Sequence, residues 1–410
     1  MLSNFQFPEF GVILFFLLSY AWIRCLPAVY RTTPVVVAML LVVTAHHAVS
    51  IFNLFSILPG ADGDANMFYK NALRALHDQN YPDVTVGTGF YEWILFFTHY
   101  TFGQSKLVGQ TLSIHFSAIS LILMTLIASV YKLPPRKAVV LIVIVGLLPT
   151  HLFFTSITFR EVFQLTGLAG GCAFAILAIE TGKTKFWLFS IPFFLFMGLF
   201  HHVLIALGAL LVGLGICLHI FRYSPNTGKA LLYSLLMLFL VGVIGFFLVV
   251  KMPATSGNDY VEMLTDHSSI NHFIFGYREA VDSANPRTSY GFMVETFEWY
   301  PAVVGLSKSY FYYVGGPWLS EIEKWIDYVP FINSIIRLSL MLFLILLFIR
   351  GKLSYESGIF LALFLLITFM WSLGSTNYGQ SFRHNVMSDW LIVLATLLRL
   401  NSGKRETQIQ

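Results

Sequence analysis

Long apolar segments separated by short polar turns run through almost the whole chain. A helix of about 20 apolar residues is long enough to cross the hydrocarbon core of a bilayer. The pattern therefore predicts an all-α, polytopic bundle of about eleven transmembrane helices, with residues 1–410 forming a single transmembrane domain. The predicted spans are 9–27, 34–57, 107–131, 138–157, 159–181, 186–200, 202–221, 230–250, 331–349, 357–374 and 386–400.

Composition supports membrane insertion independently of the pattern. Of 410 residues, 57% are hydrophobic and 11% are charged, and the mean hydropathy is +0.73. Soluble domains carry roughly 25% charged residues. The three cysteines are scattered through apolar runs, which excludes a disulfide framework. The first apolar run lacks a basic leader and continues into Arg24 and Arg31, so no cleavable signal peptide is predicted.

Residues 90–102 are apolar but too short for a confident span, and they contain Glu92 and His99. This segment is predicted to lie at the membrane interface or to re-enter it. The preceding residues 67–76 show the spacing of an amphipathic helix. Together they predict a first large external loop, 58–106, with two short interfacial helices.

The basic residues predict the orientation. Alternate loops hold 14 of the 25 Lys and Arg residues beside only three acidic residues, and the remainder of the chain has 11 basic against 18 acidic residues. Loops rich in Lys and Arg face the cytoplasm, so the N-terminus is predicted outside and the C-terminus inside. The basic residues of these loops are Arg24, Arg31, Lys132, Arg136, Lys137, Lys183, Lys185, Arg222, Lys229, Arg350, Lys352, Arg399, Lys404 and Arg405.

A second external loop is predicted at 252–329. It is long and rich in Tyr, Trp and Phe, and long loops in compact proteins are usually functional or disordered. The aromatic content argues against disorder. Tyr310–Tyr313 and Trp318 are expected on the membrane surface or along a groove.

Two carboxylates, Asp62 and Asp64, stand in the first polar stretch after two predicted spans. Acidic groups at a membrane interface are costly to dehydrate, so they usually face a cation, a sugar hydroxyl or a phosphate with its metal. Either residue could instead cap the helix that follows. One residue can do both, and catalysis is assigned to Asp64 with Asp62 behind it.

Further ionisable residues fall at the predicted outer ends of spans. The arginines suit a lipid phosphate because a guanidinium binds phosphate oxygens with two parallel hydrogen bonds. Structural alternatives exist for each group: an arginine can reach to the interface, a histidine can bond to backbone at a helix break, and Arg160–Glu161 can be a structural charge pair. The candidate substrate- and phosphate-binding residues are Arg160, Glu161, His201, His202, Arg287, Arg337, Arg383 and His384.

The Gly63-Asp64-Ala65 turn, with Tyr69 and Ala72 in the helix after it, resembles the first external loop of the GT-C glycosyltransferase superfamily. That resemblance implies a catalytic carboxylate in the loop and a polyprenyl-phosphate sugar donor. Residues 159–169, 199–203 and 382–384 resemble elements of EpsG/Wzy-type polysaccharide polymerases. Two features depart from these patterns: Glu161 stands at a usual Gln position, and the acidic loop follows the second span instead of the first.

The expected function is therefore transfer of polyprenyl-linked sugars at the outer leaflet of a bacterial inner membrane, to build a surface polysaccharide or glycolipid. The expected partners are the lipid-linked donor, a saccharide or lipid acceptor, membrane lipids and other polysaccharide-assembly proteins, without nucleic acid. No metal site or cofactor is assigned, although a divalent cation is compatible with the chemistry. A flippase for lipid-linked sugars and a non-enzymatic subunit remain as alternatives.

Overall fold

The computed structural model describes residues 7–56, 58, 61, 63–78, 81–82, 84–224, 288–290 and 299–406. Every regular element in these ranges is a helix, which confirms the all-α prediction, and one isolated β-bridge joins Ser289 to Asn377. The chain forms two compact units, one from 1–142 with 153–257 and the other from 143–152 with 258–410.

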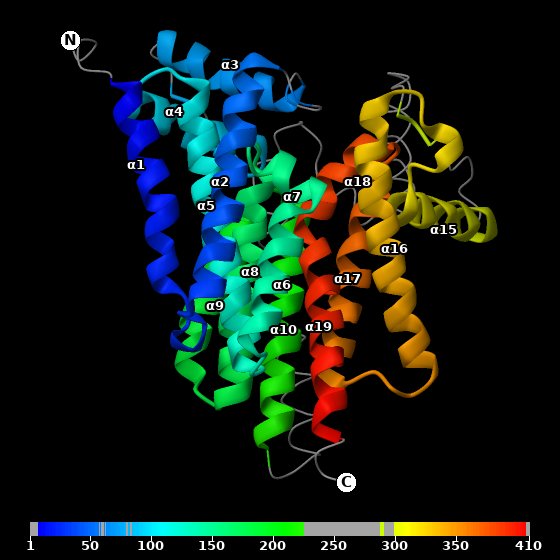
Figure 1. Ribbon diagram of the computed structural model, residues 1–410. Helices are drawn as coiled ribbons and strands as arrows, with labels where there is room; N and C mark the ends of the chain where they lie inside the picture. Colours follow the sequence, from blue (N-terminus) through cyan, green and yellow to red (C-terminus); the bar gives the residue numbers. More distant parts are fainter. Residues whose placement is uncertain are drawn as a thin grey trace. The chain divides into compact units, whose positions relative to one another are not determined.

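Long apolar helices dominate the first unit (Figure 1). α8 packs along α5 and α9, α10 packs on α9, and α1 packs on α5. The helices wholly within this unit are α1 (Pro8–Ala21), α2 (Thr33–Phe55), α3 (Asp64–His77), α4 (Thr88–Phe102), α5 (Lys106–Val130), α8 (Glu161–Thr181), α9 (Trp187–Leu199) and α10 (His202–Tyr223). Two further helices, α6 (Pro135–Leu147) and α7 (Pro149–Phe154), contribute residues to both units.

The second unit is built around α19 (Asp389–Glu406), which packs on α16 (Tyr328–Ile349) and α17 (Tyr355–Gly374). The short α18 (Tyr378–His384) precedes α19, and α15 (Trp299–Gly315) packs on α16 and α17. In Figure 1, α15 runs across the direction of α16 and α17. The aromatic segment 310–313 belongs to this crosswise helix, whereas most of the predicted loop 252–329 lies outside the described residues.

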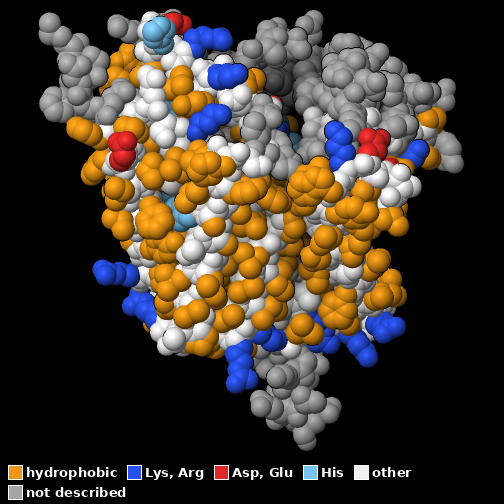
Figure 2. Space-filling model, turned by 45° about the horizontal axis from the view of Figure 1, so that its top comes forward, with side chains coloured by type: hydrophobic (Ala, Val, Ile, Leu, Met, Phe, Trp, Pro, Cys, Tyr) orange, Lys and Arg blue, Asp and Glu red, His pale blue; other side chains and the backbone are white. Residues whose placement is uncertain are grey.

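Among the residues that the structure describes, seven helices are long and apolar enough to cross a membrane, so the chain is a membrane protein with several candidate spanning helices. These candidate spans are Pro8–Cys25, Thr33–Phe55, Lys106–Val130, Glu161–Thr181, His202–Tyr223, Trp325–Ile349 and Tyr355–Gly374. On the face drawn in Figure 2, hydrophobic side chains cover most of the middle of the surface, and Lys and Arg side chains gather along its lower edge.

The other four predicted spans differ from those seven. The stretch 138–157 is divided into α6 and α7 because Pro149, which has no backbone N–H to donate, begins the second helix. The stretch 186–200 forms a shorter apolar helix, Thr184–Leu199. The predicted span 386–400 corresponds to α19, which begins at Asp389 and is not among the seven candidate spans, and 230–250 lies outside the described residues.

The interface between α8 and α9 depends on three glycines, Gly167, Gly170 and Gly171. A Cβ atom at Gly167 would lie 2.7 Å from the Cβ of Met197, and Cβ atoms at the other two would meet phenylalanine rings of α9. Ser190 on α9 donates a hydrogen bond of 2.9 Å to the carbonyl of Gly171. Small residues of this kind let two helix backbones approach closely in a membrane, where packing replaces the hydrophobic effect as the main attraction.

The ends of the helices in the first unit differ in charge. At one end, Arg222 at the end of α10 forms an ion pair of 2.7 Å with Glu180 near the end of α8. There too, the hydroxyl of Tyr30 donates to the carbonyl of Leu133 at 2.8 Å, which joins the turn before α2 to the turn after α5. The first eight basic residues of the predicted cytoplasmic loops, from Arg24 to Arg222, lie at these helix ends or in the turns beside them. The candidate site lies at the opposite ends of α8 and α10.

Candidate functional site

The acidic turn leads directly into α3, the first of the two short helices expected between residues 58 and 106. Asp64 is the first residue of α3 and is half-buried, while Gly63 occupies the N-cap position with no side chain to bond. The Asp64 carboxylate therefore lies in the first helical turn, where the N-terminal end of the helix dipole favours a negative charge. Asp62 lies outside the described residues.

An aromatic cluster connects α3 to the long helices. Ala65, Phe68 and Ala72 are buried on one face of α3, and Phe68 meets Tyr91 of α4 edge-on with ring centroids 5.2 Å apart. Tyr91 is fully buried and contacts Phe163 of α8 at 5.5 Å. Asp64 precedes Phe68 by one helical turn, so both lie on the same side of α3. Asp64 is thereby positioned one helical turn from a buried aromatic cluster.

Arg160 and Glu161 stand at the start of α8, beside the turn between α9 and α10. The Nη1 atom of Arg160 donates to the carbonyl of Phe200 at 3.3 Å, and the Nε2 atom of Gln164 donates to the same oxygen at 3.5 Å. The Nε atom of Arg160 lies 4.0 Å from Oε1 of the fully buried Glu161. A buried carboxylate requires a compensating cation, and Arg160, with 12% of its side chain exposed, supplies it while still reaching the surface.

His201 and His202 occupy the turn that follows Phe200. The Nδ1 atom of His201 accepts from the backbone N–H of Val203 at 3.4 Å and caps α10, which fits the structural interpretation of this residue. Gly87, just before α4, donates its N–H to the carbonyl of Leu199 at 2.8 Å. A Cβ atom on Gly87 would lie 3.9 Å from Nε2 of His202. The start of α4 therefore lies against the histidine turn.

The surroundings of Tyr91 show how strongly this region is desolvated. Burial, followed by the negative charge of Glu161, raises the pKa of Tyr91 well above its ordinary value. The phenol therefore remains protonated at neutral pH. The negative charge of Glu161 is balanced by Arg160, so the inner part of this site is close to neutral.

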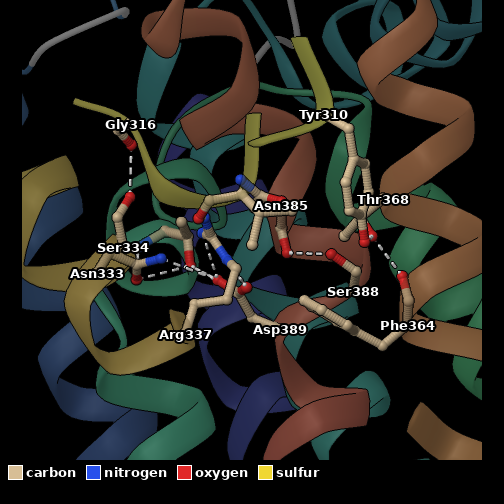
Figure 3. Close-up of polar contacts among 12 residues, drawn as sticks. Tyr310, Gly316, Asn333, Ser334, Arg337, Phe364, Thr368, Asn385, Ser388 and Asp389 are labelled. Atoms are coloured by element: carbon tan, nitrogen blue, oxygen red, sulfur yellow. Dashed lines mark hydrogen bonds and ion pairs between the residues drawn. The ribbon is translucent and has the colours of Figure 1, made fainter. Parts of the chain in front are cut away.

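The second unit contains a separate buried network around Arg337 and Asp389, which point toward each other in Figure 3. The Nε atom of Arg337 donates to Oδ1 of Asp389 at 2.7 Å, Nη2 donates to Oδ2 at 3.3 Å, and Nη1 donates to the carbonyl of Val314 at 2.9 Å. Oδ2 of Asp389 also accepts from Asn333 and from the Thr150 hydroxyl, each at 3.0 Å. The guanidinium is thus already engaged on all three nitrogens.

The remaining described candidate residues of this unit, Arg383 and His384, end α18. His384 is buried and stacks on Trp371, with ring centroids 4.0 Å apart and planes at 6°. Arg383 is half-buried in the last turn of α18. Arg287 lies outside the described residues.

The structure brings four predicted residues together in the first unit: Arg160, Glu161, His201 and His202. Arg337 and Arg383 belong to the second unit, so the convergence of four arginines on one phosphate stays a prediction. The sequence pattern predicts neither Gln164 nor Tyr91 as part of the site. The spacing of Gln164, four residues after Arg160, could have indicated that it lies on the same side of α8 and belongs to the site.

Neither a search for metal-ligand groups nor comparison with known proteins assigns a further role to these residues. Within the described ranges, no group of three or more His, Cys, Asp or Glu side chains could hold a metal ion. Comparison with protein-family models, curated proteins and solved structures yields no match.

Proposed function

We propose that this protein is a bacterial inner-membrane glycosyltransferase or polysaccharide polymerase with a GT-C-like fold of eleven spans. Its N-terminus lies outside, its C-terminus lies in the cytoplasm, and it uses polyprenyl-phosphate-linked sugars at the outer leaflet. One observation supports this most. Arg160, His201 and His202 gather at the end of the first unit that is opposite its basic turns, in the same unit as the interfacial helix that begins at Asp64.

The proposed reaction transfers a sugar from lipid phosphate to an acceptor hydroxyl. The acceptor oxygen forms a bond to the anomeric carbon of the donor sugar, and the bond between that carbon and the phosphate oxygen breaks. Asp64 takes the proton from the acceptor hydroxyl, and the lipid phosphate leaves with the bonding electrons. Arg160, aided by the histidine turn, stabilises the negative charge that develops on the departing phosphate.

Arg160 is better suited to phosphate than Arg337. Arg160 keeps 12% of its side chain exposed, and the hydrogen bond from its Nη1 to the carbonyl of Phe200 is long, at 3.3 Å. Arg337 has a fully engaged guanidinium and is 2% exposed. We therefore assign donor binding first to Arg160 and a structural role to Arg337.

Replacement of Asp64 tests the proposal. Asp64→Asn should reduce product by at least about a hundredfold, the usual contribution of a general base. The protein should still insert, because Asn is also well tolerated at the start of a helix. Surface polysaccharide or glycolipid output is measured beside membrane protein level, with Asp64→Ala as the second variant and Glu9→Gln, an exposed carboxylate at the start of α1, as the control.

A purely structural Asp64 would give the opposite pattern, with normal output from Asp64→Asn and a lower protein level for Asp64→Ala. Full output from both variants would instead favour a non-enzymatic subunit of an assembly complex.

One observation favours a transporter as the second candidate. The predicted span 138–157 is interrupted between α6 and α7, and interrupted helices are common at the substrate sites of secondary transporters. Reconstituted protein would then move a labelled polyprenyl-phosphate sugar between leaflets without forming any glycoside. Product formation by the purified protein would reject this candidate.

A further inference from the structure

A pocket of about 510 Å³ lies between the C-terminal half of α3 and the start of α4. It belongs wholly to the first unit and does not include Asp64, Arg160 or the histidines. Its lining combines charged, amide and hydroxyl groups with one large aromatic ring. The lining residues are Asn71, Arg74, Ala75, Asp78, Tyr81, Pro82, Thr85, Thr88, Gly89 and Glu92.

One hydrogen bond across the pocket is already formed without a ligand. The Nδ2 atom of Asn71 donates to Oε1 of Glu92 at 2.8 Å, which ties α3 to α4 across the pocket. A carboxylate has about four lone-pair positions, so Glu92 can accept further hydrogen bonds. Arg74 adds donors and Asp78 adds acceptors. Several donors and acceptors in the lining suit a ligand with many hydroxyl groups.

Tyr81 supplies the apolar part of the pocket. It is 68% exposed, yet its ring is supported by Phe96 at 5.3 Å and by Phe97 at 6.4 Å. An exposed ring held in place offers a large contact surface at a low entropic cost, since few side-chain torsions need to be ordered. A rigid aromatic surface beside carboxylate and amide groups matches the alternating apolar and polar faces of a pyranose ring.

The charges of the pocket argue against a phosphate ligand. Its lining has one arginine against two carboxylates, Asp78 and Glu92, so it presents no excess of positive charge. Arg160 is therefore the better candidate for binding the lipid phosphate of the donor. A neutral saccharide is the ligand that this combination fits.

We propose that the pocket between α3 and α4 binds the acceptor saccharide through its hydroxyl groups, with Tyr81 against a sugar ring. This proposal rests on the proposed glycosyl transfer. Asn71 follows Asp64 by seven residues, so both lie on nearly the same face of α3, about 10 Å apart along the helix axis. A short oligosaccharide lying along α3 would therefore place its terminal hydroxyl at the proposed base.

Binding of free glycans tests the proposal on the full-length protein in lipid nanodiscs. The probe is a panel of labelled mono- to tetrasaccharides made of hexoses, N-acetylhexosamines, deoxyhexoses and uronic acids. Wild-type protein should retain at least one neutral glycan, and Tyr81→Ala and Glu92→Gln should each bind it at least tenfold more weakly. Trp325→Ala removes a ring of the second unit that is 79% exposed, against 68% for Tyr81, and should leave binding unchanged.

Retention of no neutral glycan by the wild type, or equal retention by both pocket variants, would overturn the proposal. Tyr81 is largely exposed, so its replacement should not disturb folding, and gel filtration of each variant verifies this. Asp64→Asn separates the two proposals: it should keep glycan binding while losing transfer. Full activity of Asp64→Asn together with weaker glycan binding in the pocket variants would reject the transfer mechanism and retain the saccharide pocket.

Discussion

The Arg337–Asp389 pair shows how one buried charge is stabilised by several neighbours. Removing two charges from water costs several kcal/mol each, and mutual attraction offsets this only when the remaining hydrogen-bonding capacity is also satisfied. Here Asn333 and Thr150 bond to the carboxylate, and the carbonyl of Val314 accepts from the guanidinium. The pair therefore behaves as one unit, and either half alone is destabilising.

Asp389→Ala should lower the free energy of unfolding by about 3–5 kcal/mol, because it leaves the arginine buried without its counter-ion. Thermal unfolding in detergent measures the loss. The double variant Arg337→Met with Asp389→Leu should recover most of the stability, since apolar residues of similar volume often replace a buried ion pair at little cost. Glycosyl transfer by this double variant would establish a structural role for Arg337, while its loss at restored stability would place Arg337 in phosphate binding.

Among the helices, α4 begins after a residue with an unusual backbone conformation. Gly87 has φ 101° and ψ −127°, a region that is essentially restricted to glycine. This conformation lets its N–H reach the carbonyl of Leu199 and sets α4 against the histidine turn. Gly103, with φ 97°, follows the last residue of the same helix, at the end opposite Gly87.

Gly87→Ala and Gly103→Ala should each cost about 1–3 kcal/mol of stability from backbone strain. Only Gly87→Ala should also reduce transfer, because only this turn positions α4 beside His202. Thermal unfolding and product output, measured on both variants, separate the two effects. Equal loss of output at equal loss of stability would show that the turn has no positioning role.

Sequence patterns were sufficient for elements defined by local composition. The apolar runs located α2, α5, α8, α10 and α17 to within a few residues, and amphipathic spacing located α3. The break between α6 and α7 was missed because Pro149 hardly changes the hydropathy of its surroundings. The Arg337–Asp389 pairing was missed because 52 residues separate the partners, and the α3–α4 pocket because it depends on how two helices pack.

The predicted orientation of the protein in the membrane rests on the distribution of basic residues at the ends of the first unit. Its basic turns are predicted to face the cytoplasm, which would place α3, α4 and the pocket outside. Cys25 is exposed, while Cys172 and Cys217 are buried. A Cys25→Ser background therefore has no exposed cysteine among the three in the chain.

In that background, Tyr81→Cys should react with a membrane-impermeant maleimide on intact cells, because Tyr81 is exposed beside the external pocket. Lys183→Cys, in the basic turn after α8, should react only after the membrane is permeabilised. Labelling on a gel, compared with and without permeabilisation, provides the measurement. Reversed labelling of the two positions would invert the topology and remove the outer-leaflet mechanism with it.

The glycines of α8 affect how a genetic survey of this protein should be interpreted. At Gly167, Gly170 and Gly171 even one added methyl group would collide with α9. A selection that scores only the cell's phenotype would rank these positions beside Asp64 and Arg160, although they have no contact with any reacting group in the proposed mechanism. Substitutions that abolish catalysis leave the protein level normal, while substitutions that separate α8 from α9 expose the protein to proteolysis. The protein level in the membrane therefore distinguishes the two classes.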